Sequence, residues 1–275
     1  AVFENDSKFR VQLLAIIAAG KIAGTSCGIV IGGLISSRTS YSLVFILKAI
    51  LIILSMLLIN QTNIKNAKQE SAFSISSIIS TLKSSKIIAY LLLIIIPIYM
   101  AGTFVSYAIP LYGNEILLSQ SLISGIMMLN CMLSAYTSNT GTRIAINSIG
   151  ASKSTLLYIT CIVASIMAFG IFNTLPIAII VIIILGIADG FGLNIIFENI
   201  YTLQPNIDTT TITFMFFLAS QIARAIAPML ISSNIKNGVA NASTILAYIL
   251  AGGTLLYILF LIITKKSKKA KKLSL

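Results

Sequence analysis

Five charged side chains fall within long apolar stretches of the sequence, where a charge is costly. They are Lys21, Lys48, Asp189, Glu198 and Arg224. On insertion scales, a charge at the depth of a bilayer costs at least about 2.5–3.5 kcal/mol, so each of these needs a partner or a water-filled cavity. A buried carboxylate at this depth can load and release a proton. The structural alternative is a fixed ion pair between helices, or an acid that reaches the membrane surface.

We expect Asp189 or Glu198 to carry a proton, with Arg224 as the basic counterpart. Nine residues separate the two acids, so at about 100° per residue they face nearly opposite sides of one helix. Asn194 lies one turn before Glu198 and shares its face. The glycine-broken segment GIADGFGLNIIFEN is expected to unwind slightly beside a cavity. The other candidates for the substrate and proton pathway are Lys21, Asn130, Gln221, Tyr99 and Tyr107.

No metal ion and no cofactor is expected. The sequence has no histidine, and Cys27, Cys131 and Cys161 fall in apolar segments without metal-like spacing. No phosphate-binding loop of the type G-x-x-x-x-G-K-[ST] occurs, which disfavours a protein that hydrolyses ATP. The absence of Ser/His, GxGD and HExxH patterns disfavours an enzyme embedded in the membrane.

The elements that position these residues are expected to be transmembrane helices. Of the 275 residues, 57% are hydrophobic and 9% are charged, and the mean hydropathy is +0.99. A soluble domain of this length cannot bury so much apolar surface in one core. The composition therefore predicts an all-α polytopic membrane protein.

Apolar runs predict eight membrane-spanning helices. They cover residues 11–36, 41–60, 86–109, 121–146, 153–173, 175–203, 210–233 and 243–264. An even number of crossings places both ends of the chain on one side. If that side is cytoplasmic, nearly all loop Lys and Arg lie inside and only Arg38 and Lys236 lie outside, as the positive-inside bias requires.

The net charge of +12 does not indicate nucleic-acid binding. Lysines crowd into residues 265–272, directly after an apolar segment, and such clusters are typical of topology signals and of contact with anionic lipid. The richness in Ile, Lys, Asn and Ser favours a bacterium with an AT-rich genome, and hence a bacterial cytoplasmic membrane. Because the sequence does not begin with Met, we expect it to be part of a longer protein.

A glycine recurs at every fourth position of the stretch GKIAGTSCGIVIGG, and one more follows directly. These residues are Gly20, Gly24, Gly28, Gly32 and Gly33. Glycines at this spacing share a helix face and let a neighbouring backbone approach closely. The stretch is predicted to form a tight structural crossing of two helices, or a packed hinge that also seals the pathway.

A weaker copy of this pattern occurs in ARAIAPMLIS, residues 223–232. Ala223 and Ala227 align with Gly24 and Gly28, and Pro228 aligns with Ile29. The two stretches are six predicted helices apart. Two homologous halves of a transporter would produce a repeat at this interval.

The first stretch resembles the antiporter signature of the major facilitator superfamily, a glycine and three residues followed by G-P-x-x-G-G. Gly24, Gly28, Gly32 and Gly33 match it, and Ile29 takes the place of the proline.

Two further segments are similar to the same family. Residues 110–125, PLYGNEILLSQSLISG, resemble the end of the family's seventh helix. Residues 147–156, NSIGASKSTL, resemble a worn copy of its cytoplasmic turn D-R-x-G-R-R-x-x-L.

The resemblance implies a partial major facilitator fold, with helices five to twelve of twelve. Residues 1–60 would then hold the last two helices of the N-terminal bundle, and residues 61–85 a cytoplasmic linker. Residues 86–264 would form a six-helix C-terminal bundle, and residues 265–275 a basic cytoplasmic tail.

The resemblance also implies secondary active transport of a small molecule by alternating access, in the form of proton-coupled efflux. The expected partners are the substrate, protons and the lipid bilayer, and no oligomer is implied. The alternative is a non-transporting membrane module, a sensor or an anchor of a larger protein. Neutralising Asp189 and Arg224 would abolish transport in the first case and leave function intact in the second.

Overall fold

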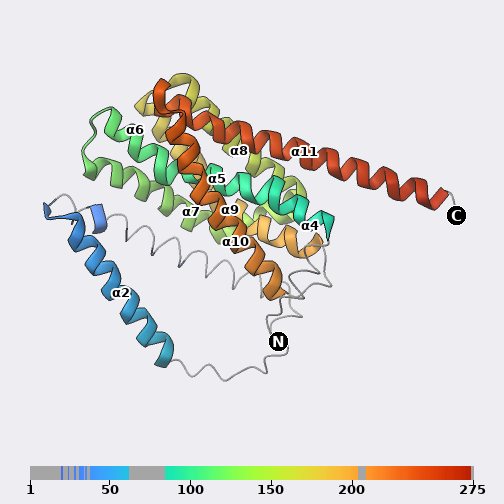
Figure 1. Ribbon diagram of the computed structural model, residues 1–275, viewed down its shortest axis with the longest axis horizontal. Helices are drawn as coiled ribbons and strands as arrows, with labels where there is room; N and C mark the ends of the chain where they lie inside the picture. The colour runs from blue at the N-terminus through green and yellow to red at the C-terminus, as the bar shows by residue number, and fades with distance from the viewer. Residues whose placement is uncertain are drawn as a thin grey trace.

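The computed structural model describes residues 20, 24, 28, 31–33, 35, 38–61, 84–203 and 209–273. Within these ranges every regular element is a helix, as the sequence predicts. Residues 84–203 and 209–273 form one packed bundle, and α2 (Tyr41–Gln61) lies apart from it (Figure 1). The predicted linker over residues 61–85 lies almost entirely outside the described residues.

The bundle begins with a long apolar helix whose winding changes twice. It consists of α4 (Ser85–Tyr90), η1 (Leu91–Ile95), α5 (Ile96–Thr103), η2 (Phe104–Ala108) and α6 (Ile109–Glu115), of which η1 and η2 are π-helical. Each π segment ends two residues before a proline, Pro97 or Pro110. Proline has no N–H to donate and crowds the preceding turn, so a wider local winding relieves the clash. The helix continues to Glu115, beyond the predicted end at residue 109.

The rest of the bundle follows the predicted order. Its elements are α7 (Gln120–Ile149), α8 (Ala151–Phe172), α9 (Leu175–Leu203), α10 (Thr209–Ser233), the short 3₁₀ turn η3 (Ile235–Asn237) and α11 (Val239–Leu273). The helix α11 starts earlier than predicted, directly after Gly238, whose φ of +89° ends the preceding turn. It also continues through the lysine-rich tail, because lysine and alanine are good helix formers.

The turn between α7 and α8 consists of one residue. Gly150 has a φ of +81°, a conformation that side chains disfavour. The hydroxyl of Ser154 donates to the carbonyls of Ala145 and Gly150 across this turn, over 3.0 and 2.9 Å. The glycine retained in NSIGASKSTL is therefore required by the backbone conformation.

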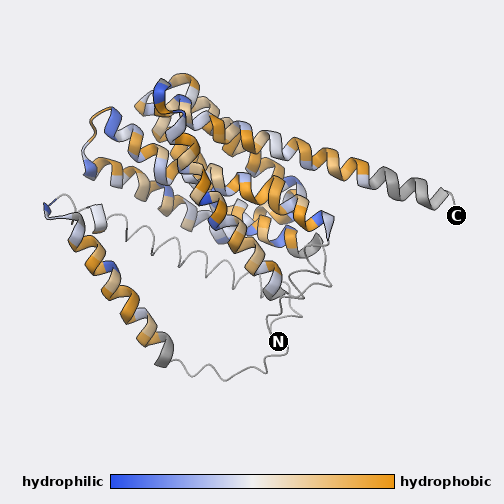
Figure 2. Ribbon diagram, viewed as in Figure 1, coloured by the Kyte–Doolittle hydropathy of each residue, from blue (hydrophilic) through white to orange (hydrophobic). Residues whose placement is uncertain are grey.

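Five helical segments of the described chain are long and apolar enough to cross a membrane. They are Ser85–Glu115, Ala151–Phe172, Leu175–Ile200, Thr211–Ser233 and Val239–Thr264. A shorter apolar stretch, Ser42–Leu58, lies in α2. The predicted helix over residues 121–146 exists as α7, but its many Ser, Thr and Asn residues keep it out of this set. With these spans the chain is an all-α integral membrane protein, and apolar residues dominate its helices (Figure 2).

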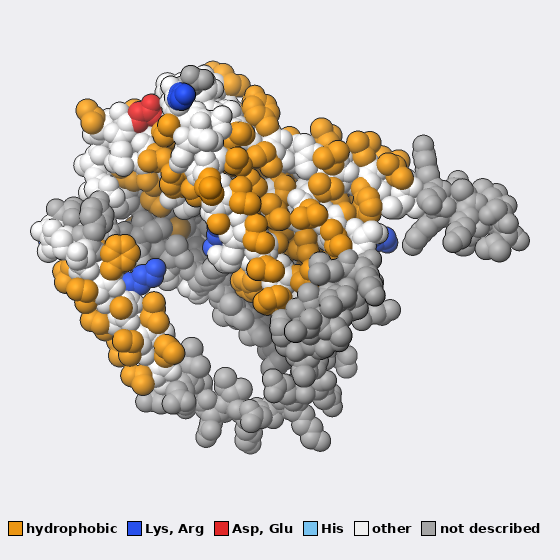
Figure 3. Space-filling view, in the orientation of Figure 1, with side chains coloured by type: hydrophobic (Ala, Val, Ile, Leu, Met, Phe, Trp, Pro, Cys, Tyr) orange, Lys and Arg blue, Asp and Glu red, His pale blue; other side chains and the backbone are white. Residues whose placement is uncertain are grey.

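The bundle and α2 differ in how far their apolar side chains are buried. In the bundle, aromatic rings meet edge to face, and Phe104 and Tyr112 both contact the ring of Phe169 at centroid distances of 5.3 and 4.9 Å. On α2, apolar side chains are exposed around the helix, for example Phe45 at 68% and Leu58 at 65%. Hydrophobic side chains also cover much of the face of the bundle seen in Figure 3, as contact with lipid requires.

Candidate functional site

A partly buried hydrogen bond joins α8 to α9 near the middle of the apolar span Leu175–Ile200. The hydroxyl of Tyr158 donates to Oδ1 of Asp189 over 2.7 Å. The tyrosine is only 1% exposed, and the aspartate is partly buried. A carboxylate within the membrane span therefore receives its hydrogen bond from a hydroxyl. The predicted unwinding around Asp189 is wrong, because α9 is a continuous helix from Leu175 to Leu203.

Arg224 lies near the middle of the span in α10 and contacts an aromatic ring. Its guanidinium carbon is 5.4 Å from the ring centroid of Tyr99 on α5. Phe216 meets the same ring edge-on at 5.4 Å and supports it from α10. Tyr99 also lies within electrostatic range of Asp189. Tyr99 thus stacks with the guanidinium on α10 and lies within electrostatic range of the carboxylate on α9.

Small residues of α10 let this helix approach α5. Ala223 and Ala227 are fully buried on the face turned into the bundle. Pro228 lies inside α10 and has no N–H to bond the carbonyl of Arg224, four residues earlier. The hydroxyl of Ser232 donates to the carbonyl of Pro228 over 2.8 Å. The carbonyl of Arg224 therefore lacks the helical hydrogen bond that residue 228 would otherwise donate to it.

Polar side chains form a strip along α10 and the first helix of the bundle. Gln221, Arg224 and Ser232 are exposed and lie within roughly 80° of one another around α10. The hydroxyls of Ser232 and Tyr107 share a hydrogen bond of 2.8 Å. Together with Tyr99, these residues form what we call the polar strip. Because lipid cannot solvate such groups, the strip requires a polar environment within the membrane.

Asn130 and Asn194 connect α7 with α9. The amide of Asn130 donates to the carbonyl of Ile182 over 3.1 Å. The amide of Asn194 donates to the hydroxyls of Ser138 and Thr142 over 3.0 and 3.2 Å. Both asparagines therefore hold α7 against α9. Asn194 lies five residues after Asp189, so these two side chains point to sides of α9 about 140° apart.

Glycines of α9 bring α7 even closer. A Cβ at Gly186 would lie 2.8 Å from the carbonyl oxygen of Asn130, and one at Gly190 would lie 2.5 Å from that of Ser134. We call this contact between α7 and α9, with its asparagine hydrogen bonds, the α7–α9 seam. Glu198 lies one turn beyond Asn194 and is partly buried.

Among the described glycines of GKIAGTSCGIVIGG, the last two are those at which an added Cβ would meet atoms of the described chain. A Cβ at Gly33 would meet the side chain of Ser124 on α7, and one at Gly32 would lie 3.6 Å from Cγ1 of Val44. At Gly20, Gly24 and Gly28 a Cβ would have no atom of the described chain within 4 Å.

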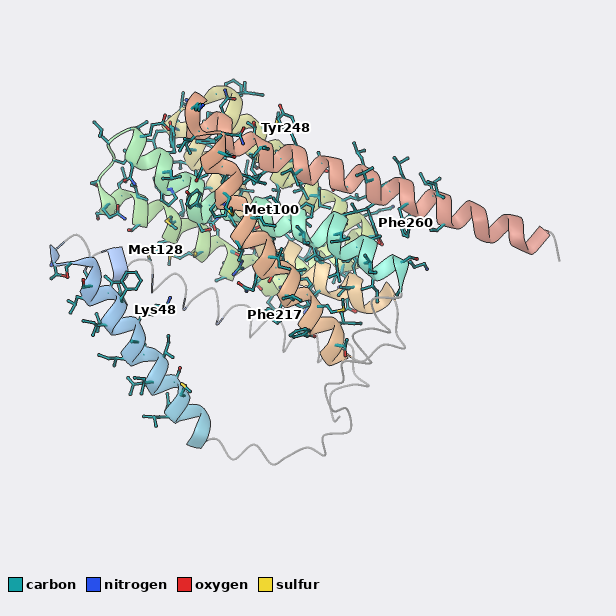
Figure 4. The ribbon with its side chains drawn as sticks, viewed as in Figure 1. Lys48, Met100, Met128, Phe217, Tyr248 and Phe260 are labelled. Carbon is teal, nitrogen blue, oxygen red and sulfur yellow. The ribbon has the colours of Figure 1, made fainter. Side chains whose placement is uncertain are left out.

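Lys21 and Lys48, two of the charged residues singled out in the sequence, are not among the described residues of the bundle. Lys21 belongs to the residues that the structure does not describe. Lys48 is exposed on α2, apart from the bundle (Figure 4).

Sequence reasoning did not identify Tyr158. A tyrosine in an apolar stretch is unremarkable by itself, and its partner Asp189 lies on another helix. The signal that was present is the glycine-rich segment around Asp189, since Gly192 lies against the Tyr158 ring. Among the described residues, no group of three His, Cys, Asp or Glu side chains is arranged to hold a metal ion.

Comparison with known proteins agrees with this architecture. No curated protein matches the chain. The sequence model of the Major Facilitator Superfamily, however, matches residues 6–228. This match includes the glycine stretch, the Tyr158–Asp189 hydrogen bond and α10 up to Pro228. Since it covers most of the sequence, the chain belongs to the Major Facilitator Superfamily, a family of membrane transporters.

Proposed function

We propose that the protein carries out secondary active transport of a small molecule by alternating access, in the form of proton-coupled efflux. In this proposal Asp189 loads and releases the coupled proton, and Arg224 is its basic counterpart. The polar strip lines the substrate pathway, and Asn130, Asn194, Glu198 and Lys21 are further candidates for that pathway.

The observation that carries the proposal is the partner of Asp189. A basic partner in direct contact would hold the carboxylate in its charged form. A hydroxyl group can donate to the carboxylate and can also accept from the protonated acid, so it supports both states. The hydrogen bond from Tyr158 is of this second kind, and it lies near the middle of an apolar span. Both features fit a group that changes its protonation during transport.

The position of Arg224 supports a pathway beside this carboxylate. Its side chain is exposed near the middle of a span, and it stacks on Tyr99, which is in electrostatic range of Asp189. An arginine facing hydrocarbon would be among the costliest arrangements in a membrane protein. A water-filled path along the polar strip accounts for its exposure.

The direction and the organisation are part of the proposal. Efflux rests on the likeness of residues 24–33 to the antiporter signature. We also propose that residues 1–60 hold the last two helices of an N-terminal bundle, that residues 61–85 form a cytoplasmic linker and that residues 86–264 form the C-terminal bundle. The basic loops and tail favour cytoplasmic ends in a bacterial cytoplasmic membrane.

The test uses inverted vesicles that contain the full chain and have an acidic lumen. The probes are ethidium, which is cationic, and carboxyfluorescein, which is anionic. With the wild type, at least one probe should accumulate in the vesicle lumen while protons leave the lumen. The variant Asp189→Asn should lose this coupling, because an amide cannot carry the proton.

The control is Glu115→Gln, which alters an exposed carboxylate at the end of α6. The side chain of Glu115 accepts from the backbone N–H of Val239 over 3.2 Å, and glutamine retains an acceptor oxygen. This variant should transport as the wild type does. Coupled transport that persists in Asp189→Asn would refute the role of this carboxylate. A wild type that moves neither probe would favour the sensor or anchor module instead.

A further inference from the structure

The ring of Tyr158 is held between two positions of α9 that lie one turn apart. Its hydroxyl donates to Asp189, and the Cγ end of its ring lies against Gly192. A Cβ at Gly192 would overlap the ring at Cγ and at both Cδ atoms. Residues three apart on a helix are neighbours on one face, so the glycine creates the space and the carboxylate receives the hydroxyl.

Packing leaves this ring little freedom. Tyr158 is 1% exposed, and Phe191 meets it edge-on at a centroid distance of 6.2 Å. Displacing the ring would require movement of α8 or α9, which pack against each other. The hydroxyl therefore has a fixed position relative to Oδ1 of Asp189.

We propose that Tyr158 is a positioning residue that sets the pH at which Asp189 takes up its proton, and that Gly192 fixes Tyr158 for this task. This inference rests on the proposed role of Asp189 in proton-coupled transport. A hydrogen bond to an ionised acceptor is roughly twice as strong as one between neutral groups. The hydroxyl of Tyr158 therefore favours the carboxylate over the protonated acid, and the proton leaves at a lower pH than it otherwise would.

The other helices of the bundle carry further polar or titratable groups. Tyr99 of α5 is within electrostatic range of Asp189, and Arg224 of α10 stacks over Tyr99. From α4, Tyr90 donates to the carbonyl of Ile196 over 3.4 Å. The α7–α9 seam is built from uncharged Asn, Ser and Thr side chains. In the described part of the chain, Tyr158 donates the direct hydrogen bond to Asp189. Removing its hydroxyl leaves these other groups in place.

The test measures protonation of Asp189 without any substrate. Infrared difference spectra of the purified full chain are recorded against pH, and the carboxylic-acid band of Asp189 is assigned by its loss in Asp189→Asn. In Tyr158→Phe, the midpoint of this band should move to higher pH by about one unit, since a charge-assisted hydrogen bond is lost. Replacement of Tyr158 by 3-fluorotyrosine, a more acidic donor, should move the midpoint to lower pH.

The matched control is Tyr90→Phe, which removes another buried hydroxyl whose acceptor is a backbone carbonyl. Its midpoint should equal that of the wild type. An unchanged midpoint in folded Tyr158→Phe, or in the fluorinated protein if Tyr158→Phe does not fold, would overturn the inference. Shifts of the same sign in both would do so as well.

The proposed function fails on a different observation. If coupled transport in vesicles persists in Asp189→Asn, the transport role of this carboxylate is refuted, whatever the infrared midpoints are. If transport requires Asp189 and the midpoints do not respond to Tyr158, the function stands and this inference falls.

Discussion

The helix α9 has two polar faces that serve different purposes. Toward α7, Gly186 and Gly190 admit neighbouring backbone, and Asn194 donates to hydroxyl groups. Toward α8, Gly192 admits an aromatic ring, and Asp189 accepts from its hydroxyl. On the first face no titratable side chain takes part in these contacts, whereas on the second both partners of the hydrogen bond are titratable. One helix can therefore combine a fixed contact with a titratable hydrogen-bonded pair.

The largest effect on stability is expected where backbone meets backbone, in the α7–α9 seam. In Gly190→Ala the new Cβ would lie 2.5 Å from the carbonyl oxygen of Ser134, so two helices must separate. Overpacking of this kind should lower the free energy of unfolding by about 1–3 kcal/mol. Thermal unfolding in detergent measures it.

The matched control for this substitution lies on the partner helix. Gly125 of α7 has no atom within 4 Å of an added Cβ, so Gly125→Ala should be neutral or slightly stabilising. Equal stability of the two variants would show that the seam is not closely packed, and the contrast between the faces of α9 would be lost.

A smaller loss of stability is expected at Asn194. In Asn194→Ala the hydrogen bonds to Ser138 and Thr142 disappear, and the free energy of unfolding should fall by about 1 kcal/mol, since such bonds in membranes average roughly 0.6 kcal/mol each. The infrared midpoint of Asp189 should not move, because this change affects the other face. A shifted midpoint would show that the two faces are coupled. Asn139→Ala, at an exposed position of α7, is the control for the loss of an amide.

The smallest effect on stability is expected at Arg224, on the polar strip. Arg224→Lys keeps the charge and loses the flat guanidinium that stacks over Tyr99. The free energy of unfolding should change by less than about 0.5 kcal/mol, because this side chain is exposed. The rate of coupled transport should fall several-fold. Arg143→Lys, at an exposed position of α7, should change neither quantity. Unfolding and transport that decline together would make Arg224 a structural residue.

Within the described residues the sequence predicted the helices well, because long apolar runs leave few alternatives in a membrane protein. The predicted helix over residues 11–36 lies mostly outside these residues. The predicted range 175–203 coincides with α9, and 210–233 differs from α10 by one residue. The end at residue 109 was wrong because Pro110 is accommodated after a π-helical turn. A pattern of residue types does not reveal how a neighbouring turn adapts to a proline.

The sequence identified the charged residues of the candidate site but not the residues that contact them. Asp189 and Arg224 are conspicuous because a charge in an apolar run has a large cost. Tyr158 carries no such signal, since the chemistry of its hydroxyl depends on the helix opposite. The spacing rule that drew attention to residues 20–33 also applies to Gly186, Gly190 and Asn194, and would have indicated the α7–α9 seam.

The helix α11 acts mechanically as a single rod. Its 35 residues run without interruption from Val239 to Leu273, and at 1.5 Å per residue they extend for about 50 Å, well beyond the hydrocarbon layer of about 30 Å. No joint separates the part inside the membrane from the lysine-bearing end (Figure 1). Any tilt of the span during a transport cycle would therefore swing the far end as a lever arm. A fluorescent label there would report the motion of the bundle at an amplified scale.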